Sequence, residues 1–374
     1  MQKDWSKSEV KQFRKLLEEG NSITEICPIL KRSRSSLERA VKTYNLQGVG
    51  KEMRMATNVM VATDSKPTKK EIVNANLDLI KKIKEDLVKV KPYKIKRSIK
   101  SKEGDTLIVQ FTDWHVGRVV KDTEGNITFD VSIFETRINI LLQEILKLLD
   151  NNIKKGTPIK DVVIACCGDI ADGQGIFAEQ NTMLQFAPPY QVKKALEIIQ
   201  KFILALLERG LPVTFYGVKG NHGEIRVAGK SIDPDAHWDL MLYLMLDWWQ
   251  NTMLKSDKLK IVYSQLDYLI AVIRGWRYLI RHQAPNQSET PSGKAKLLGW
   301  NKLHTCVALI FGHFHHWGVW DKNGITCFRG GALSGGDDLS EEMGESSDIV
   351  QLIWGCHDKR KLTFLYPVDL GGKE

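Results

Sequence analysis

Five short motifs in this chain carry side chains that can bind divalent metal ions. In order they read Phe-Thr-Asp-Trp-His at 111–115, Cys-Gly-Asp-Ile-Ala-Asp-Gly at 167–173, Lys-Gly-Asn-His-Gly-Glu at 219–224, Arg-His-Gln at 281–283 and Gly-His-Phe-His-His at 312–316. Carboxylate, amide and imidazole groups together suit ions such as manganese, iron or zinc. Two such ions about 4 Å apart lower the pKa of water and neutralise phosphate oxygens. The residue types therefore indicate hydrolysis of a phosphate ester, with Asp169 as the carboxylate shared by both ions.

Each motif follows an apolar run that predicts a buried strand. These runs cover residues 106–112, 162–167, 213–218, 278–280 and 307–311. Amphipathic patterns at 134–149 and 191–209 predict helices that connect the first strands. Because open α/β sheets collect their ligands beyond the carboxyl ends of the strands, we expect the motifs to converge there.

The order of the motifs resembles the calcineurin-like metallophosphoesterase superfamily, and the resemblance spans roughly residues 106–370. It implies an α/β fold in which a four-layer β-sandwich is flanked by helices. Carried over motif by motif, it implies a first metal held by Asp113, His115, Asp169 and His315, and a second held by Asp169, Asn221, His282 and His313. His282 is the weakest of these assignments, since a single histidine after a strand is a weak signal.

The resemblance also implies two residues that act on the substrate. His222 would stabilise the transition state or protonate the leaving oxygen, and Asp172 would orient it. The sequence departs from the family at one point: an acid often follows Asn-His directly, whereas here Gly223 precedes Glu224. Taken singly, each motif is more often a loop or a coincidence, but five of them in this order, each after a strand, favour a metal centre.

Composition is that of a protein outside membranes. No apolar run approaches the roughly 20 residues of a bilayer span, and the N-terminus lacks an apolar signal stretch. The six cysteines show no disulfide or zinc spacing. We therefore expect a location in the reducing cytoplasm and no membrane partner.

Charge is distributed unevenly along the chain. Residues 1–102 hold 25 Lys and Arg against 12 Asp and Glu, whereas residues 103–374 hold 29 against 33. A basic appendage of this kind indicates contact with a polyanion. The alternative is a solvated tail that only keeps the protein in solution.

Residues 1–50 predict a small all-α trihelical domain. Three capping-box patterns begin at Ser6, Ser22 and Ser35, and Gly20 is expected to end the first helix. Trp5 and the run Glu-Gly-Asn-Ser-Ile-Thr-Glu-Ile-Cys resemble Myb-like and resolvase-type helix-turn-helix domains, whose third helix enters the major groove. That resemblance implies DNA contacts by Lys31, Arg32, Arg34, Ser36, Arg39 and Lys42. A protein-binding trihelical module is the alternative.

Residues 51–102 are expected to form a basic linker between this domain and a catalytic domain at 103–374. An amphipathic pattern at 69–90 predicts a helix that packs on the catalytic domain or pairs with a second copy as a homodimer. The strongly basic residues 91–102 could follow a phosphate backbone.

Together these features favour a metal-dependent DNA phosphodiesterase, endonuclease or exonuclease, with two divalent ions, manganese foremost and iron, zinc or magnesium as alternatives. A DNA-binding domain raises the local concentration of phosphodiester near the metals. The pairing resembles phosphoesterases carried by phages and other mobile elements, which implies a bacterial or phage-infected cell. Two alternatives stay open: a phosphomonoesterase with a DNA-localising domain, and a non-catalytic DNA-binding protein. The sequence does not distinguish DNA from RNA or a small ester, nor does it say whether a partner ATPase takes part.

Overall fold

The computed structural model describes residues 5–18, 23–44, 104–154, 158–176, 180–227, 230–284, 291–322, 324–335 and 348–371. The chain divides into two compact units, Met1–Asn74 and Ala75–Glu374. The linker expected at 51–102, including its helix at 69–90, lies outside the described residues. Within the described part, no helix is both long enough and apolar enough to span a membrane.

The described residues of the first unit form three short helices, α1 (Lys7–Glu18), α2 (Ile23–Leu30) and α3 (Arg34–Thr43). Their buried apolar side chains form one small core: Phe13, Leu17, Ile26, Leu37 and Ala40. The rings of Trp5 and Phe13 lie 5.4 Å apart at one side of this core.

The helix starts differ from the expected capping boxes at one position. Ser6 and Glu9 form the expected reciprocal pair: the Glu9 amide donates to Ser6 Oγ at 3.2 Å, and the Ser6 amide donates to Glu9 Oε2 at 3.0 Å. The box expected at Ser35 is wrong, because α3 already begins at Arg34 with Ser33 at its N-cap. Ser35 is therefore the second residue of α3 and does not cap it. Ser22 and Gly20 lie outside the described residues.

A six-stranded sheet forms the centre of the second unit, in the order β15-β14-β1-β4-β5-β8. Its strands are β1 (Asp105–Phe111), β4 (Ile159–Cys166), β5 (Val213–Gly217), β8 (Leu259–Tyr263), β14 (Val350–His357) and β15 (Arg360–Asp369). β1, β4, β5 and β8 are parallel, whereas β14 runs antiparallel to β1, and β15 runs antiparallel to β14 at the edge of the sheet. The carboxyl ends of β1, β4 and β5 therefore lie side by side at one edge of the sheet.

A five-stranded sheet packs against the first, in the order β12-β13-β11-β10-β9. Its strands are β9 (Tyr268–Ile273), β10 (Trp276–Arg281), β11 (Ala308–Phe311), β12 (Gly318–Lys322) and β13 (Ile325–Arg329). β10, β11 and β13 are parallel, and antiparallel β9 and β12 form the two edges.

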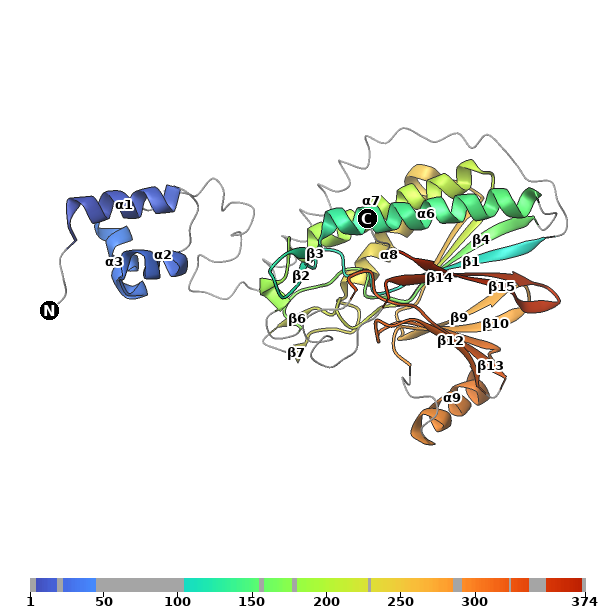
Figure 1. The fold of residues 1–374 in the computed structure, drawn as a ribbon. Coiled ribbons are helices and arrows are strands. Elements are labelled where there is room, and N and C mark those ends of the chain that lie inside the picture. The colour runs from blue at the N-terminus through green and yellow to red at the C-terminus, as the bar shows by residue number, and fades with distance from the viewer. Residues whose placement is uncertain are drawn as a thin grey trace. The chain divides into compact units, whose positions relative to one another are not determined.

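Helices cover the outer faces of both sheets (Figure 1). They are α6 (Val131–Lys154), α7 (Pro188–Glu208) and α8 (Trp238–Trp249) on the six-stranded sheet, and α9 (Pro291–His304) on the five-stranded sheet. Strand alternation separates the cores: Leu107 and Val109 face the helices, whereas Ile108 faces Tyr278 and Ile310 between the sheets. This layering confirms the α/β fold predicted from the sequence.

Short elements surround the edge at which the parallel strands end. The hairpins β2 (Val120–Lys121) with β3 (Ile127–Phe129) and β6 (Arg226–Val227) with β7 (Lys230–Ser231) lie there, as Figure 1 shows. The second unit also has two short helical turns, the 3₁₀ helix η1 (Gln180–Thr182) and the π-helical turn η2 (Gln250–Leu254).

Candidate metal centre

All five motifs begin where a strand ends. Those of β1, β4 and β5 lie on the six-stranded sheet and those of β10 and β11 on the five-stranded sheet, so the candidate ligands collect where the two sheets meet. The seven residues are Asp113, His115, Asp169, Asn221, His282, His313 and His315. In the structure they form two adjoining clusters.

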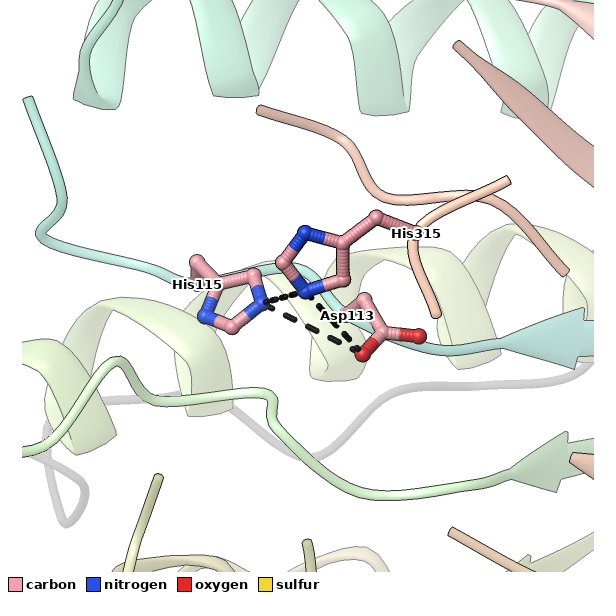
Figure 2. Close-up of side chains that lie close together, drawn as sticks. All are labelled: Asp113, His115 and His315. Atoms are coloured by element: carbon pink, nitrogen blue, oxygen red, sulfur yellow. Dashed lines mark hydrogen bonds and ion pairs between the residues drawn. The ribbon is translucent and has the colours of Figure 1, made fainter. Parts of the chain in front are cut away.

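Figure 2 shows the first cluster, formed by Asp113, His115 and His315. The Nε2 atoms of the two histidines are 3.1 Å apart. Asp113 Oδ1 lies 4.0 Å from the Nε2 of His115 and 3.8 Å from that of His315. Three potential ligand atoms thus converge on one point.

The second cluster contains Asp169, Asn221, His282 and His313. His282 Nε2 lies 2.9 Å from Asp169 Oδ2 and 2.8 Å from Asn221 Oδ1. His313 Nδ1 lies 2.8 Å from Asn221 Oδ1 and 3.2 Å from His282 Nε2. His282, the weakest assignment from the sequence, is therefore buried at the middle of this group.

The ring nitrogens are oriented as metal ligands require. His115 Nδ1 lies 2.9 Å from Asp172 Oδ1, and His282 Nδ1 lies 2.9 Å from the Cys167 carbonyl oxygen. An acceptor at Nδ1 fixes the proton there and leaves the Nε2 lone pair for a cation. In both residues Nε2 is the atom that faces its cluster.

Asp169 provides a second sign that cations fit this site. Its Oδ1 accepts the backbone N–H groups of Asn221 at 2.8 Å and His222 at 2.7 Å. Its Oδ2 is buried and accepts no hydrogen bond, although it points at His282. A buried carboxylate oxygen without a donor is costly unless a positive charge lies beside it.

The backbone at the centre is held in an unusual conformation. Five of the seven candidate ligands have positive φ angles, namely Asp113 (51°), His115 (47°), Asp169 (52°), His313 (75°) and His315 (62°). Residues other than glycine rarely adopt this region, and such strain concentrates at functional sites. Glycines allow the ligand loops to approach closely: a Cβ at Gly220 would strike Asp169, and one at Gly312 would strike Asp113.

Burial and neighbouring charges shift the pKa values in opposite directions. Burial raises the pKa of Asp113 despite the nearby imidazoles. Burial opposes ionisation of Asp169 too, yet His282 and His222 hold its pKa well below the usual range. Burial likewise disfavours charge on His282, but Asp169 raises the pKa of that imidazole to about 9. Burial and the charge of His282 lower the pKa of His313 to about 4.

His222 and Asp172 lie beside the first cluster. Asp172 Oδ1 is 2.9 Å from His115 Nδ1 and 3.3 Å from His222 Nδ1, so one carboxylate contacts both imidazoles. Burial alone would lower the pKa of His222, but Asp169 and Asp172 raise it above its ordinary value. The His222 side chain is 13% exposed, so it can reach a bound substrate.

Asp239 is the main residue that sequence reasoning missed. Its buried carboxylate accepts backbone N–H groups from Asp169 (3.0 Å), Ile170 (3.2 Å), Ala171 (3.4 Å) and Gly220 (2.9 Å). It therefore ties the loop after β4 to the loop after β5. His237, the N-cap of α8, accepts the Asp239 amide. The Glu224 carboxylate does not join these hydrogen bonds; its Oε2 lies 2.6 Å from Arg226 Nε instead.

Two glutamines fix the loop that carries Asp172. Gln191 accepts the Gly173 amide at 2.9 Å and donates to the Gly173 carbonyl at 3.2 Å. Gln180 donates to the Asp172 carbonyl at 2.6 Å. On the opposite side, the Leu333 amide donates to the Asp113 carbonyl at 2.9 Å. The glycine-rich stretch near Leu333 thus supports the ligand backbone.

The residues expected to contact DNA lie in the first unit. Lys31 and Arg39 are exposed, and Ser36 is half-buried. Arg32 is used internally: it pairs with Glu9 at 3.1 Å and lies 4.9 Å from the Trp5 ring centre. Arg34 and Lys42 are on α3, but their side chains lie outside the described set.

Comparison with known proteins gives one family match. The model of the calcineurin-like phosphoesterase family matches residues 106–317. Among solved structures, Vps29 of Entamoeba histolytica is 12% identical, with 71% of this chain and 99% of the other covered and a TM-score of 0.31. An archaeal phosphodiesterase is 11% identical, with 70% and 99% covered and a TM-score of 0.33. A Streptococcus pneumoniae protein described as a predicted phosphoesterase is 11% identical, with 71% and 99% covered and a TM-score of 0.27. No curated protein matches the sequence significantly.

Proposed function

Because the chain belongs to the calcineurin-like phosphoesterase family, we propose that it is a metal-dependent phosphodiesterase that cuts DNA. The observation that carries the proposal is the combination in one chain of two clusters of metal-binding side chains with a basic three-helix unit. A unit that binds DNA would raise the concentration of phosphodiester bonds near the centre. A phosphatase for small monoesters gains nothing from such an arrangement.

The two clusters would hold one divalent ion each. Asp113, His115 and His315 would bind the first, and Asn221, His282 and His313 the second, with Asp169 between the two. Mixed oxygen and imidazole ligands suit manganese, with iron, zinc and magnesium as alternatives. Two ions in this position supply Lewis acidity, a water of lowered pKa and neutralisation of the phosphate charge.

His222 would donate a proton to the leaving oxygen of the substrate. Asp169 and Asp172 raise its pKa above the ordinary value, which favours the protonated form needed in a proton donor. Asp172 Oδ1 lies 3.3 Å from His222 Nδ1 and would keep the ring in position. Since Asp172 also contacts His115, the same carboxylate orients a metal ligand and the proton donor.

The first unit would bind the DNA through α3. Lys31, which lies between α2 and α3, and Arg39 on α3 are exposed and would contact phosphate, whereas Arg32 would stabilise the unit by its contacts with Glu9 and Trp5. Phosphate contacts of this kind position a protein on DNA and weaken as salt rises.

Metal-dependent cleavage tests the catalytic part of the proposal. The full chain is incubated with manganese and labelled duplex, nicked or single-stranded DNA, beside a small phosphodiester and a small phosphomonoester. We expect cleavage of DNA and of the diester, with both reduced about 10²- to 10⁴-fold by His222→Ala. The control His357→Ala, remote from the centre, should cut like the wild type. Turnover of the monoester with intact DNA would overturn the proposal in favour of a phosphomonoesterase, and neither activity would leave a DNA-binding protein without catalysis.

Charge reversal in the full chain tests the role of residues 31–42, which include most of α3. Lys31→Glu with Arg39→Glu should weaken duplex binding and flatten its dependence on salt, while turnover of the small diester stays unchanged. The matched pair Lys11→Glu with Arg14→Glu reverses the same charge on the exposed face of α1. Equal loss of DNA binding in both pairs would mean that the unit attracts DNA only by its net charge.

A further inference from the structure

Within residues 103–374, positive charge is concentrated on the five-stranded sheet and α9. Residues 276–335, which contain β10 to β13 and α9, carry seven Lys and Arg against two Asp and Glu. The rest of residues 103–374 carries 22 against 31. A basic region inside the otherwise acidic residues 103–374 indicates a surface for a polyanion, separate from the basic first 102 residues.

Strand alternation shows which face of the five-stranded sheet carries this charge. Leu279, Leu309 and Cys327 belong to the core beneath α9, on the face of the sheet that is turned away from the six-stranded sheet. Side chains alternate along a strand, so residues two positions before or after these three point to the same outer face. The basic residues at outward positions of the described strands are Arg277, Arg281, Lys322 and Arg329. No acidic residue occupies an outward position of these described strands, and Asp321, next to Lys322, is held at 3.7 Å by Lys361 instead.

Aromatic rings accompany the arginines on this face. The guanidinium of Arg281 lies 4.4 Å from the Trp300 ring centre and 5.7 Å from that of Tyr268. Arg329 lies 5.1 Å from the Trp320 ring centre. We call the residues Tyr268, Arg281, Trp300, Phe314, Trp320 and Arg329 the arginine–aromatic strip. All six are half-buried, so each presents part of its surface to solvent.

The strip ends at the metal centre. Arg281 and Arg329 are the last residues of the parallel strands β10 and β13, which flank β11. Two inter-strand spacings separate them by about 10 Å. Arg281 directly precedes His282, and Phe314 stands between His313 and His315 with its ring 4.9 Å from that of His313.

We infer that the arginine–aromatic strip binds a single-stranded polynucleotide and guides it to the metal centre. Nucleobases stack on aromatic rings irrespective of sequence, and an arginine stacked on a ring directs its N–H donors along the ring plane toward phosphate. The inference rests on the proposed phosphodiesterase function and adds the form of its substrate at the point of cleavage.

Photocrosslinking to the full chain in EDTA tests the strip without cleavage. A single-stranded oligonucleotide carrying 5-iodouracil is irradiated with the wild type, and the linked peptides are identified by mass spectrometry. We expect crosslinks at Trp300, Phe314 or Trp320. Crosslinks confined to residues 1–102 would overturn the inference.

Binding of the same oligonucleotide, measured by fluorescence anisotropy in EDTA, supplies the second readout. Arg329→Gln and Trp320→Leu should each weaken binding about tenfold, whereas the controls Lys147→Gln on α6 and Tyr366→Leu on β15 bind like the wild type. Wild-type affinity in both strip variants would contradict the inference. If polyglutamate displaced the labelled oligonucleotide as well as unlabelled oligonucleotide does, that result would also contradict it, because it would indicate a surface for acidic protein. Because no metal is present, these results stand apart from the manganese-dependent cleavage that tests the proposed function.

Discussion

The three-helix unit and the phosphoesterase unit differ in how far their stabilising contacts reach along the chain. In the first, Ser6 pairs with Glu9 three residues later, and Arg32 returns to Glu9 across 23 residues. In the second, the His313 amide donates to Asp113 across 200 residues, and the Thr112 amide donates to Gln351 across 239. Local devices therefore support the small unit, whereas the metal centre depends on contacts between distant loops. Variants that remove one kind of contact at a time separate these two kinds of support.

The largest effect is expected from Asp169→Asn. The amide keeps an oxygen for the Asn221 and His222 N–H groups, so the fold should persist, but the substitution removes the negative charge beside His282. We expect activity to fall about 10³-fold or more, which corresponds to roughly 4 kcal/mol on the barrier. Calorimetric metal titration and turnover of the small diester measure the change. The control Asp267→Asn alters an exposed carboxylate, and equal losses in both variants would refute this role for Asp169.

A smaller but double effect is expected from Asp239→Asn. The amide group would turn an N–H donor toward backbone N–H groups that now share two oxygens. We expect the free energy of unfolding to fall by about 1–3 kcal/mol and metal affinity to fall about 10- to 100-fold. Urea unfolding and metal titration test this, with Asp247→Asn on the same helix as the control. Loss of stability with unchanged metal affinity would show that Asp239 supports the fold and not the centre.

Ser6→Ala should destabilise only the three-helix unit. Loss of the cap on α1 costs about 1 kcal/mol. Hydrogen exchange should show faster exchange in α1 to α3 and unchanged exchange in the six-stranded sheet. Ser35→Ala is the matched control, because Ser35 lies inside α3, where alanine is the better helix former. Slower exchange after Ser6→Ala, or a comparable loss after Ser35→Ala, would argue against capping as the cause.

The smallest effect concerns acid. Hydrogen bonds from Ser6 and the ion pair with Arg32 lower the pKa of Glu9 from 4.5 to about 2. A depressed folded-state pKa stabilises the unit above pH 4.5, and this contribution is lost as the pH falls from 4.5 toward 2. Exchange of α1 amides, corrected for intrinsic rates, should rise across this window in the wild type and vary less in Glu9→Gln. The same slope in both would exclude Glu9 as the titrating group.

Most of the α/β framework was predictable because each motif-bearing strand is a buried apolar run next to polar residues. β1, β4, β5, β10 and β11 all end within two residues of their expected ends. β14 was not predicted, although it lies beside β1, because its sequence carries no motif and its place in the sheet depends on long-range pairing. The strand order, likewise, is set by packing that no local pattern records.

The candidate ligands were recognisable by residue type and spacing, and the structure brings all seven together. Asp239 was not, because a carboxylate near the start of a helix usually reads as a local cap or a solvated charge. One signal was present: Asp239 follows His237 at the start of an apolar helix, where a charged residue must find buried partners. Arg32 shows the reverse case. Its position beside other cations predicted a DNA contact, whereas in the structure its guanidinium pairs with Glu9 and lies over the Trp5 ring.

The wide separation of the metal-binding motifs has a consequence for biosynthesis. Neither cluster can be complete until the ribosome has released the chain beyond His315, because His313 and His315 come last among the candidate ligands. β14, which pairs with β1 on the side opposite to β4, emerges later still. A nascent polypeptide would thus pass most of its synthesis unable to acquire both ions, and loading with metal would mark a molecule whose two sheets have already closed on each other.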